Sequence, residues 1–210
     1  MSDAGATQQQ VTKENAGETQ QQQVVKEMEF EEKGEAERGS APDEVVIAIS
    51  PAFGDQMHAQ TLTEIPHAAI LRELFAGLEE EGVKARVVRI WRSADLAAMG
   101  YDAAKLSGSG ISISIQSRGT ALIHQRDLVP LAPMELFPQA PSIDLPTYRH
   151  IARNAAQYAK GDSPSPVPQV NDPMARPKWQ AISSVFHIRE TEFVRPDEKP
   201  VELGVTFKGR

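Results

Sequence analysis

The chain has 210 residues and a formal net charge of −7, and it contains no cysteine. The missing thiols exclude disulfides, thiolate metal sites and a cysteine nucleophile, and the negative charge argues against a nucleic-acid partner. No apolar run approaches the roughly 20 residues of a membrane helix. The first residues, MSDAGATQQQ, lack the basic and apolar parts of a secretory signal. These features predict a cytoplasmic protein without a membrane or nucleic-acid partner.

Residues 1–42 differ in composition from the rest of the chain. An imperfect repeat, AGATQQQVTKE and then AGETQQQQVVKE, precedes the acidic segment MEFEEKGEAERGSAP. Its few large apolar side chains cannot offset the entropy lost on ordering, so we predict an acidic, Gln-rich disordered tail over 1–42. The alternative is a docking tail, in which a weak amphipathic helix binds a partner or shell through Val11, Val24, Val25, Met28 and Phe30.

From residue 43 the pattern becomes that of a folded domain. DEVVIAISPAFG predicts a buried strand and then a loop, and IPHAAILRELFAGLEEEG predicts a helix with Pro66 in its first turn and Gly82 at its end. KARVVRIW predicts the next strand, and SADLAAMGYDAAKL a short helix that begins near Ser93 or Asp95. Two further strands are expected in ISISI and TALIHQRD. This order of elements is typical of an α/β layer fold.

The second half of the domain continues with a clear helix, DLPTYRHIARNAAQYAKG, which Gly161 ends. The Pro-rich segment 162–178 is expected to run extended over a surface. AISSVFHIRETEFV and VELGVTF predict two late strands that form a hairpin. Antiparallel strands at one edge would make the sheet mixed.

The stretch LSGSGISISIQSRGT, residues 106–120, has the Gly–Ser opening of a loop that could cradle a phosphate. It lacks the third glycine and the following helix of a dinucleotide fingerprint, and it lacks the spacing of a Gly-x-Ser-x-Gly elbow. Its alternation instead predicts a strand with an apolar face and a small, polar face. We expect the polar face to let a large amide-rich ligand or another subunit approach closely.

No convincing catalytic or metal-binding set is present in the chain. The five histidines form no His-x-x-x-His pair. His67 is expected to cap or pack, His187 to lie in a strand core, and His124, at a strand end, is the best single catalytic candidate. We predict no catalytic residue and no metal site in this chain.

Six blocks, in order between residues 43 and 207, are similar to the medium (β) subunit of adenosylcobalamin-dependent glycerol and diol dehydratases. They are DEVVIAISPAF, IPHAAILRELFAGLEEEGVKARVVRI, LSGSGISISIQSRGTALIHQRDL, MELFPQAP, TYRHIARNAAQYAKGDSPSPVP and NDPMARPKWQA. The resemblance implies a three-layer α/β sandwich with a mixed, mostly parallel sheet. Residues 43–210 would form this domain, with a Pro-rich C-terminal extension, and would cover a cobalamin.

The resemblance also implies an activity and partners. The family carries out radical dehydration of glycerol or 1,2-propanediol to aldehydes, in a doubled heterotrimer of large, medium and small subunits. The substrate site is expected in the large subunit, and adenosylcobalamin is shared between the large and medium subunits. A reactivating factor is a further expected partner, and a bacterial microcompartment within the cytoplasm is an alternative location.

Four residues are assigned to the cofactor by the resemblance. Asp95 matches a carboxylate that accepts a hydrogen bond from a corrin amide, and Leu131 and Pro138 match positions that offer backbone carbonyls. Arg118 stands where relatives usually have lysine, near the phosphate-bearing tail of the cofactor; a planar guanidinium makes different contacts from an ammonium. The alternatives are a helix cap for Asp95 and a surface cation for Arg118.

Two further positions are less specific. Pro133 replaces a polar residue common in relatives, so a local contact would be lost, and Arg176 is assigned to an interface or an anion. A rival identity is the small subunit of the dehydratase-reactivating chaperone, which should lack the segment from MELFPQAP to NDPMARPK. A free-standing nucleotide-binding domain is disfavoured by the incomplete glycine motif.

Overall fold

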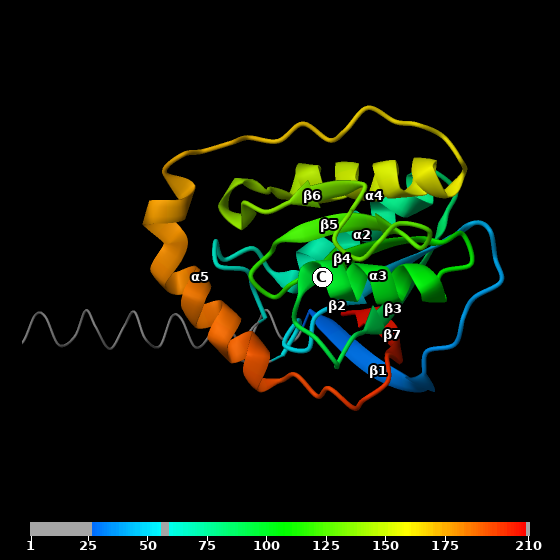
Figure 1. Cartoon of the computed structure of the whole chain (residues 1–210), viewed down its shortest axis with the longest axis horizontal. Helices are drawn as coiled ribbons and strands as arrows, with labels where there is room; N and C mark the ends of the chain where they lie inside the picture. The colour runs from blue at the N-terminus through cyan, green and yellow to red at the C-terminus, as the bar shows by residue number, and fades with distance from the viewer. Residues whose placement is uncertain (1–26, 56–58, 209–210) are drawn as a thin grey trace, which may run out of the picture.

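The computed structural model of the chain describes residues 27–55 and 59–208. A seven-stranded sheet in the order β1-β7-β3-β2-β4-β5-β6 forms its centre (Figure 1). The strands are β1 Met28–Glu35, β2 Glu44–Ile49, β3 Lys84–Arg89, β4 Ile111–Ile115, β5 Ala121–Gln125, β6 Glu135–Phe137 and β7 Val201–Phe207. The helices are α2 His67–Glu80, α3 Leu96–Leu106, α4 Leu145–Ala159 and α5 Ala175–Glu192, with a short 3-10 helix at Ala140–Ser142.

The sheet is mixed, as predicted, with parallel pairing in its centre. Strand β2 pairs in parallel with β3 on one side and β4 on the other. The pairs β1–β7, β3–β7, β4–β5 and β5–β6 are antiparallel. Parallel pairs are therefore the minority, and the expectation of a mostly parallel sheet is wrong in this respect. The physical reason is the connections: hairpin-length loops join β4, β5 and β6, and such short loops allow only antiparallel pairing.

Two helical layers cover the sheet, which confirms the three-layer sandwich. In β2, Val45, Ile47 and Ile49 point into a core shared with α2 and α4. The alternate residues, Val46 and Ala48, point into a smaller core under α3. This follows from the two-residue period of a strand, which sends successive side chains to opposite faces. Because β2 is buried on both faces, its sequence is a continuous apolar run.

The helix ends follow local signals in the sequence. Asp144 caps α4 by accepting a hydrogen bond from the Thr147 backbone N–H at 2.9 Å, and the hydrogen bonds from Thr147 lower the pKa of the Asp144 carboxyl. Pro66 is the N-cap of α2. Gly82 and Gly161 follow α2 and α4 with φ angles of 71° and 85°, which is the left-handed conformation that glycine adopts at helix ends.

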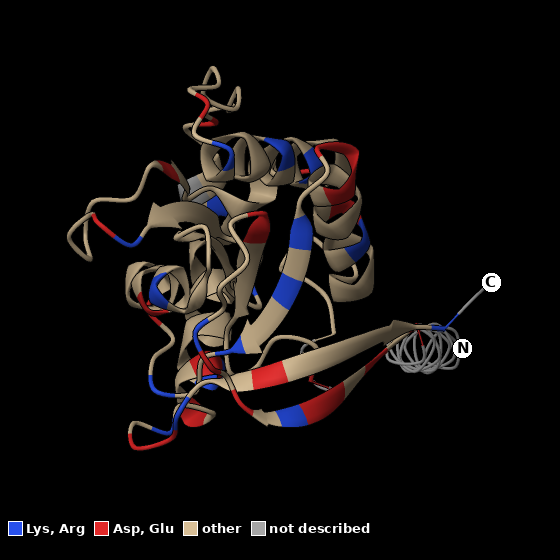
Figure 2. Cartoon of the chain, turned by 90° about the vertical axis from the view of Figure 1, so that its right-hand side faces the viewer, with Lys and Arg blue, Asp and Glu red and all other residues tan. Residues whose placement is uncertain are grey.

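Strand β1 corrects the predicted boundary of the tail. Residues 28–35, which we expected to be disordered, pair antiparallel with β7 along one edge of the sheet (Figure 2). Met28 and Phe30 pack against the core, so they do not belong to a docking helix. The remaining tail residues of that hypothesis, Val11, Val24 and Val25, lie outside the described residues. Strand β7 is confirmed, but it forms no hairpin with residues 181–194, because most of those residues are helical. In the sheet, β7 lies between β1 and β3.

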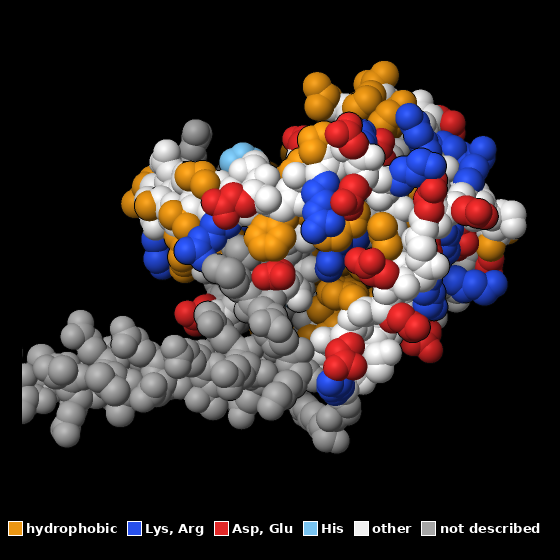
Figure 3. All heavy atoms as spheres, turned by 90° about the horizontal axis from the view of Figure 1, so that it is seen from below, with side chains coloured by type: hydrophobic (Ala, Val, Ile, Leu, Met, Phe, Trp, Pro, Cys, Tyr) orange, Lys and Arg blue, Asp and Glu red, His pale blue; other side chains and the backbone are white. Residues whose placement is uncertain are grey.

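Helix α5 corrects a second expectation. Residues 181–194 were predicted as a strand, and the structure places them in α5, which stands beside the domain (Figure 1). Its outward face leaves large apolar side chains exposed, namely Ile182, Val185 and Ile188. From below, the α5 region appears as a separate lobe with hydrophobic side chains on its surface (Figure 3). No helix within residues 27–55 and 59–208 is long and apolar enough to cross a membrane.

The Pro-rich segment runs over the surface without regular structure from residue 162 to residue 174, as predicted, but its last four residues, 175–178, belong to α5. It is anchored by the buried Glu135 carboxylate, which accepts hydrogen bonds from Asn154 Nδ2 at 2.8 Å, the Tyr158 hydroxyl at 3.0 Å and the Val167 backbone N–H at 2.8 Å. Burial, together with the Glu135 charge, raises the pKa of Tyr158 to about 12.

Candidate functional site

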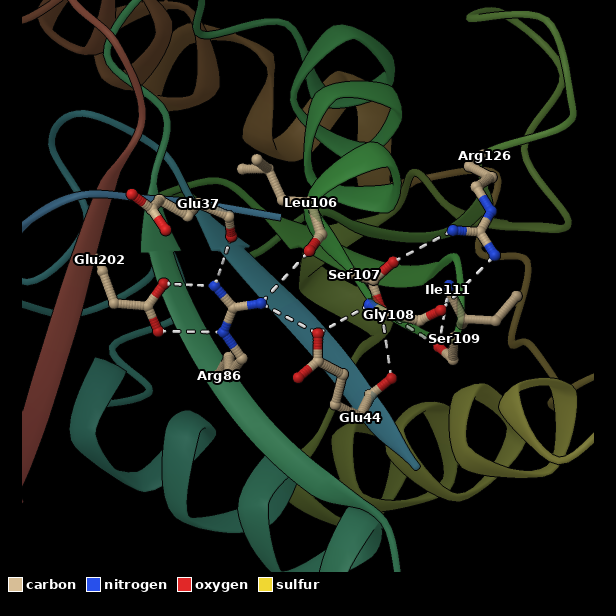
Figure 4. Close-up of polar contacts among 10 residues, drawn as sticks. All are labelled: Glu37, Glu44, Arg86, Leu106, Ser107, Gly108, Ser109, Ile111, Arg126 and Glu202. Carbon is tan, nitrogen blue, oxygen red and sulfur yellow. Dashed lines mark hydrogen bonds and ion pairs between the residues drawn. The ribbon is translucent and has the colours of Figure 1, made fainter. Parts of the chain in front are cut away.

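The Gly–Ser loop before β4 binds a carboxylate of its own chain. Glu44 Oε1 accepts a hydrogen bond from the Gly108 backbone N–H at 2.7 Å, and the Ser107 hydroxyl donates to the Glu44 carbonyl at 3.2 Å (Figure 4). A Cβ atom at Gly108 would lie 2.2 Å from the Ala41 carbonyl oxygen, so only glycine fits there. The loop that looks like a phosphate cradle in the sequence therefore binds a carboxylate of the same chain.

Arg86 completes this cluster and joins three strands. Its guanidinium donates to both carboxylate oxygens of Glu202 on β7, at 3.2 and 2.8 Å, and to Glu44 Oε1 on β2 at 2.9 Å (Figure 4). The pKa of Arg86 is raised, chiefly by the hydrogen bonds to Glu202. Two carboxylates and two backbone carbonyls share the Arg86 guanidinium, so the cluster stabilises the fold and its cation is already occupied.

The small, polar face of β4 is also used internally. The Ser112 and Ser114 hydroxyls donate to the backbone carbonyls of Gly100 and Leu96 in α3, at 2.7 and 2.8 Å. A Cβ atom at Gly100 would lie 2.7 Å from Leu122 Cδ1. The neighbour that approaches this face closely is therefore α3, and the expectation that a ligand or another subunit does so is wrong.

The cleft that remains lies at the carboxyl ends of β3 and β4, under α5. It consists of two cavities that share Arg118, with volumes of about 410 and 390 Å3. The larger one lies between the N-terminal half of α5 and the loop after β6, and Pro138, Trp179 and Ser183 contribute to its lining. The smaller one lies between the start of α3 and the C-terminal half of α5. Ligands of open α/β sheets commonly bind at this end of parallel strands.

Arg118 is the side chain common to both cavities. Its Nε donates to Gln116 Oε1 at 3.0 Å and to the Thr120 hydroxyl at 3.4 Å, and its Nη1 donates to the Ser183 hydroxyl at 3.3 Å. Burial lowers the pKa of Arg118, and the nearby Glu190 carboxylate partly opposes this effect. Arg118 is therefore a half-buried cation whose guanidinium is held by three side chains.

Asp95 lines the smaller cavity and also caps α3. Its Oδ1 accepts from the Ala98 backbone N–H at 2.8 Å, and its own N–H donates to the Ser93 hydroxyl at 3.0 Å. The helix-cap alternative is thus realised. Because the residue is exposed and the cap uses Oδ1, the carboxylate retains acceptor capacity toward the cavity.

The other two assigned residues lie apart from each other. Pro138 lines the larger cavity. Leu131 lies in the loop between β5 and β6, where it is 83% exposed, and it lines neither cavity. The structure therefore gathers Asp95, Arg118 and Pro138 along one cleft and leaves Leu131 outside it. The side chain of Arg176 is outside the described part of the structure.

Glu190 is a buried residue of α5 that lines neither cavity but holds this helix to the sheet, and the sequence analysis missed it. Its carboxylate is 2% exposed and accepts hydrogen bonds from the backbone N–H groups of Ala52 and Ser117, at 3.2 and 3.1 Å, and from the Ser117 hydroxyl. These contacts fix the C-terminal end of α5 to the loops that follow β2 and β4. No motif marks Glu190 in the sequence, and the strand assignment hid its place on the inner face of a helix.

Among the described residues, the histidines have structural roles or lie outside the cavities, with one exception. The buried His67 accepts from the Gly54 backbone N–H at 2.9 Å through Nδ1, and its Nε2 lies 2.7 Å from the Ser117 carbonyl oxygen, as expected for polar packing. The ring nitrogens of the buried His124 face the carbonyls of Gln125 and Pro130. His187, expected in a strand core, is exposed on α5 and lines the smaller cavity. Among the described residues, no group of three His, Asp or Glu side chains is placed to hold a metal ion.

Together, the mixed sheet and the three layers define an α/β sandwich with a cleft at the carboxyl ends of its parallel strands. The family model of the dehydratase medium subunit matches residues 50–165. The chain belongs to this dehydratase medium subunit family, and the resemblance noted in the sequence is confirmed. The matched residues include Asp95, Arg118, Leu131 and Pro138 and end before α5.

Two solved structures are also similar to the chain, each with 24% sequence identity. One is described as a glycerol dehydratase reactivase, with a TM-score of 0.49. The other is a diol dehydratase-reactivating factor complexed with ADP and Mg2+, with a TM-score of 0.42. Each match covers 59% of this chain and 97% of the other chain.

Proposed function

We propose that this chain is the medium subunit of an adenosylcobalamin-dependent glycerol or 1,2-propanediol dehydratase, and that the cleft under α5 meets the cofactor at the interface with a large subunit. Membership of the dehydratase medium subunit family supports the first part. The observation that carries the second part is that Asp95 and Arg118 line one cavity while Arg118 and Pro138 line the next.

The chemistry of the cleft fits the periphery of this cofactor. Corrin side chains end in amides, which need both hydrogen-bond acceptors and donors, and the cofactor tail carries a phosphate. Asp95 supplies a carboxylate acceptor and Arg118 a guanidinium whose Nη2 has no recorded partner among the described residues. Cavities of about 410 and 390 Å3 are of the size that binds parts of large ligands.

The proposal divides the work between cofactor and chain. When bound, the cofactor supplies the radical chemistry of diol dehydration, and the protein supplies binding and shielding. In this chain, Asp95 accepts from an amide, Arg118 holds an amide or phosphate oxygen, and α5 limits the access of water to the cleft. Substrate selection belongs to the large subunit.

The proposal is tested on the assembled complex. This chain is co-expressed with large and small dehydratase subunits, and adenosylcobalamin retention is measured by equilibrium dialysis alongside aldehyde formation from glycerol and from 1,2-propanediol. We expect Arg118→Ala to raise the dissociation constant of the cofactor about 10- to 100-fold, because a hydrogen bond to a charged group contributes about 1.5–3 kcal/mol. The ratio of the two substrate activities should not change.

The control is Arg153→Ala. Arg153 is an exposed residue of α4 that lines neither cavity, and it pairs with Glu80 of α2. Full activity without this chain, or unchanged cofactor retention in Arg118→Ala, would contradict the proposal. Association with the large subunit of a reactivating factor instead of the dehydratase large subunit would favour the rival identity.

A further inference from the structure

Gln116 links the segment that precedes Asp95 to Arg118. It follows the last residue of β4, and its side chain is buried, with the residue 4% exposed. Its Nε2 donates to the Ala94 carbonyl at 2.5 Å, and its Oε1 accepts from Arg118 Nε at 3.0 Å. One carboxamide therefore joins the segment that ends in Asp95 to the guanidinium of Arg118.

The surrounding hydrogen bonds fix the orientation of the Gln116 side-chain amide. Its backbone N–H donates to the Thr120 carbonyl at 3.0 Å, and the Gly119 N–H donates back to the Gln116 carbonyl at 2.9 Å. The Thr120 hydroxyl also donates to Gln116 Oε1. Since Ala94 offers a carbonyl on one side and Arg118 and Thr120 offer donors on the other, both ends of the amide are matched.

Asp95 and Arg118 come from different parts of the chain. Asp95 ends the loop between β3 and α3, whereas Arg118 lies in the turn between β4 and β5. Each side chain has its own local contacts, but within the described residues the Gln116 amide is the hydrogen-bonded link from the Ala94–Asp95 segment to Arg118. The separation of the two charged groups therefore depends on this buried amide.

We propose that Gln116 is a positioning residue for the cofactor, which fixes the Arg118 guanidinium at a set distance from the Asp95 cap so that both meet one ligand edge. The inference rests on the proposed function and adds a residue for which the sequence resemblance assigned no role. Gln116 lines the smaller cavity, but it is 4% exposed and both ends of its amide bond to the protein. It acts through Arg118, and binding benefits because the guanidinium is ordered before the ligand arrives.

The test uses Gln116→Met and Gln116→Glu in the assembled complex, with adenosylcobalamin binding by equilibrium dialysis as the readout. Methionine keeps the volume but loses both hydrogen bonds, and we expect the cofactor dissociation constant to rise about tenfold. Glutamate keeps the acceptor for Arg118 but faces the Ala94 carbonyl with a second acceptor. We expect an intermediate effect, and this variant also serves if the methionine variant fails to assemble. Gln157→Met, an amide on α4 outside the cleft, is the matched control.

A double-mutant cycle separates positioning from general stability. If Gln116 acts through Arg118, Gln116→Met should have no further effect on binding in the Arg118→Ala background, whereas a purely structural role would give the same loss in both backgrounds. Wild-type binding by both Gln116 variants, together with weakened binding by Arg118→Ala, would overturn this inference alone. Unchanged binding by Arg118→Ala would overturn the proposed function beneath it.

Discussion

The attachment of α5 through Glu190 gives the sharpest prediction about the dynamics of the cleft. Glu190→Ala removes the acceptor from the Ala52 N–H and the Ser117 hydroxyl, whereas the Ser117 N–H keeps the Ser50 hydroxyl at 3.1 Å. The variant therefore leaves the Ala52 N–H without its acceptor and loses the hydrogen bonds to a carboxylate. Together these changes cost about 2–3 kcal/mol in the free energy that holds α5 in place. We expect this loss to favour local detachment of α5 over global unfolding.

Hydrogen–deuterium exchange with peptide resolution measures this detachment. A change of about 2–3 kcal/mol predicts that amides of α5 exchange about 30- to 150-fold faster in Glu190→Ala, while amides of β4 and α2 keep their wild-type rates. Glu190→Gln should lie between the two, because one amide oxygen still accepts. Glu192→Ala, an exposed carboxylate on the same helix, is the control. Wild-type exchange of α5 in Glu190→Ala would refute the idea that this carboxylate anchors the helix.

Three further predictions concern stability and are checked by chemical denaturation. Gly108→Ala should lower the free energy of unfolding by about 1–3 kcal/mol, because the new Cβ would overlap the Ala41 carbonyl; an unchanged midpoint would contradict the close approach. Arg86→Met should cost about 3 kcal/mol by leaving the buried Glu44 carboxylate without its cation, and Arg86→Lys should cost less. The pKa of Tyr158 is raised from 10.0 to about 12 in the folded state. The stabilising contribution of the Tyr158 hydroxyl to the folded state is therefore fully present below pH 10 and is lost as the pH rises to about 12. Tyr158→Phe should flatten this part of the pH profile, and an identical alkaline slope would argue against the assignment.

Much of the layered fold could be predicted from the sequence, because the signals are local and repeated. The apolar run of β2 and the apolar stripes of α2 and α4 show their burial directly. Charged caps and glycines mark where helices begin and end. The order of strands in the sheet could not be predicted, because pairing depends on partners far along the chain, such as β7 between β1 and β3.

The two wrong elements each had a weaker competing signal. In β1, Met28 and Phe30 alternate with exposed glutamates, which is a strand period, but the charge of the segment indicated disorder. In α5, the less exposed positions Trp179, Ser183, Phe186 and Glu190 recur at intervals of four, three and four, which is a helical period. Because two of these four residues are polar, apolar periodicity alone did not reveal the helix.

The candidate site divides in the same way. Resemblance to known medium subunits led to Asp95, Arg118 and Pro138, which the structure gathers along one cleft. Gln116 and Glu190 could not be found without the fold, because their roles arise from contacts with segments distant in the sequence. Neither residue belongs to a sequence motif. What distinguishes them is that both side chains are buried and that their polar atoms make hydrogen bonds within the protein.

The position of β7 between β1 and β3 has a consequence for how the protein is made. During synthesis, β1 leaves the ribosome first, yet its only strand neighbour among the described residues, β7, is more than 160 residues further along the chain. Until then β1 has both edges unpaired, the situation in which nascent strands associate with other chains. Its exposed glutamates and lysine (Figure 2) repel such neighbours. The charge pattern that hides this strand in the sequence therefore protects it until its partner has been translated.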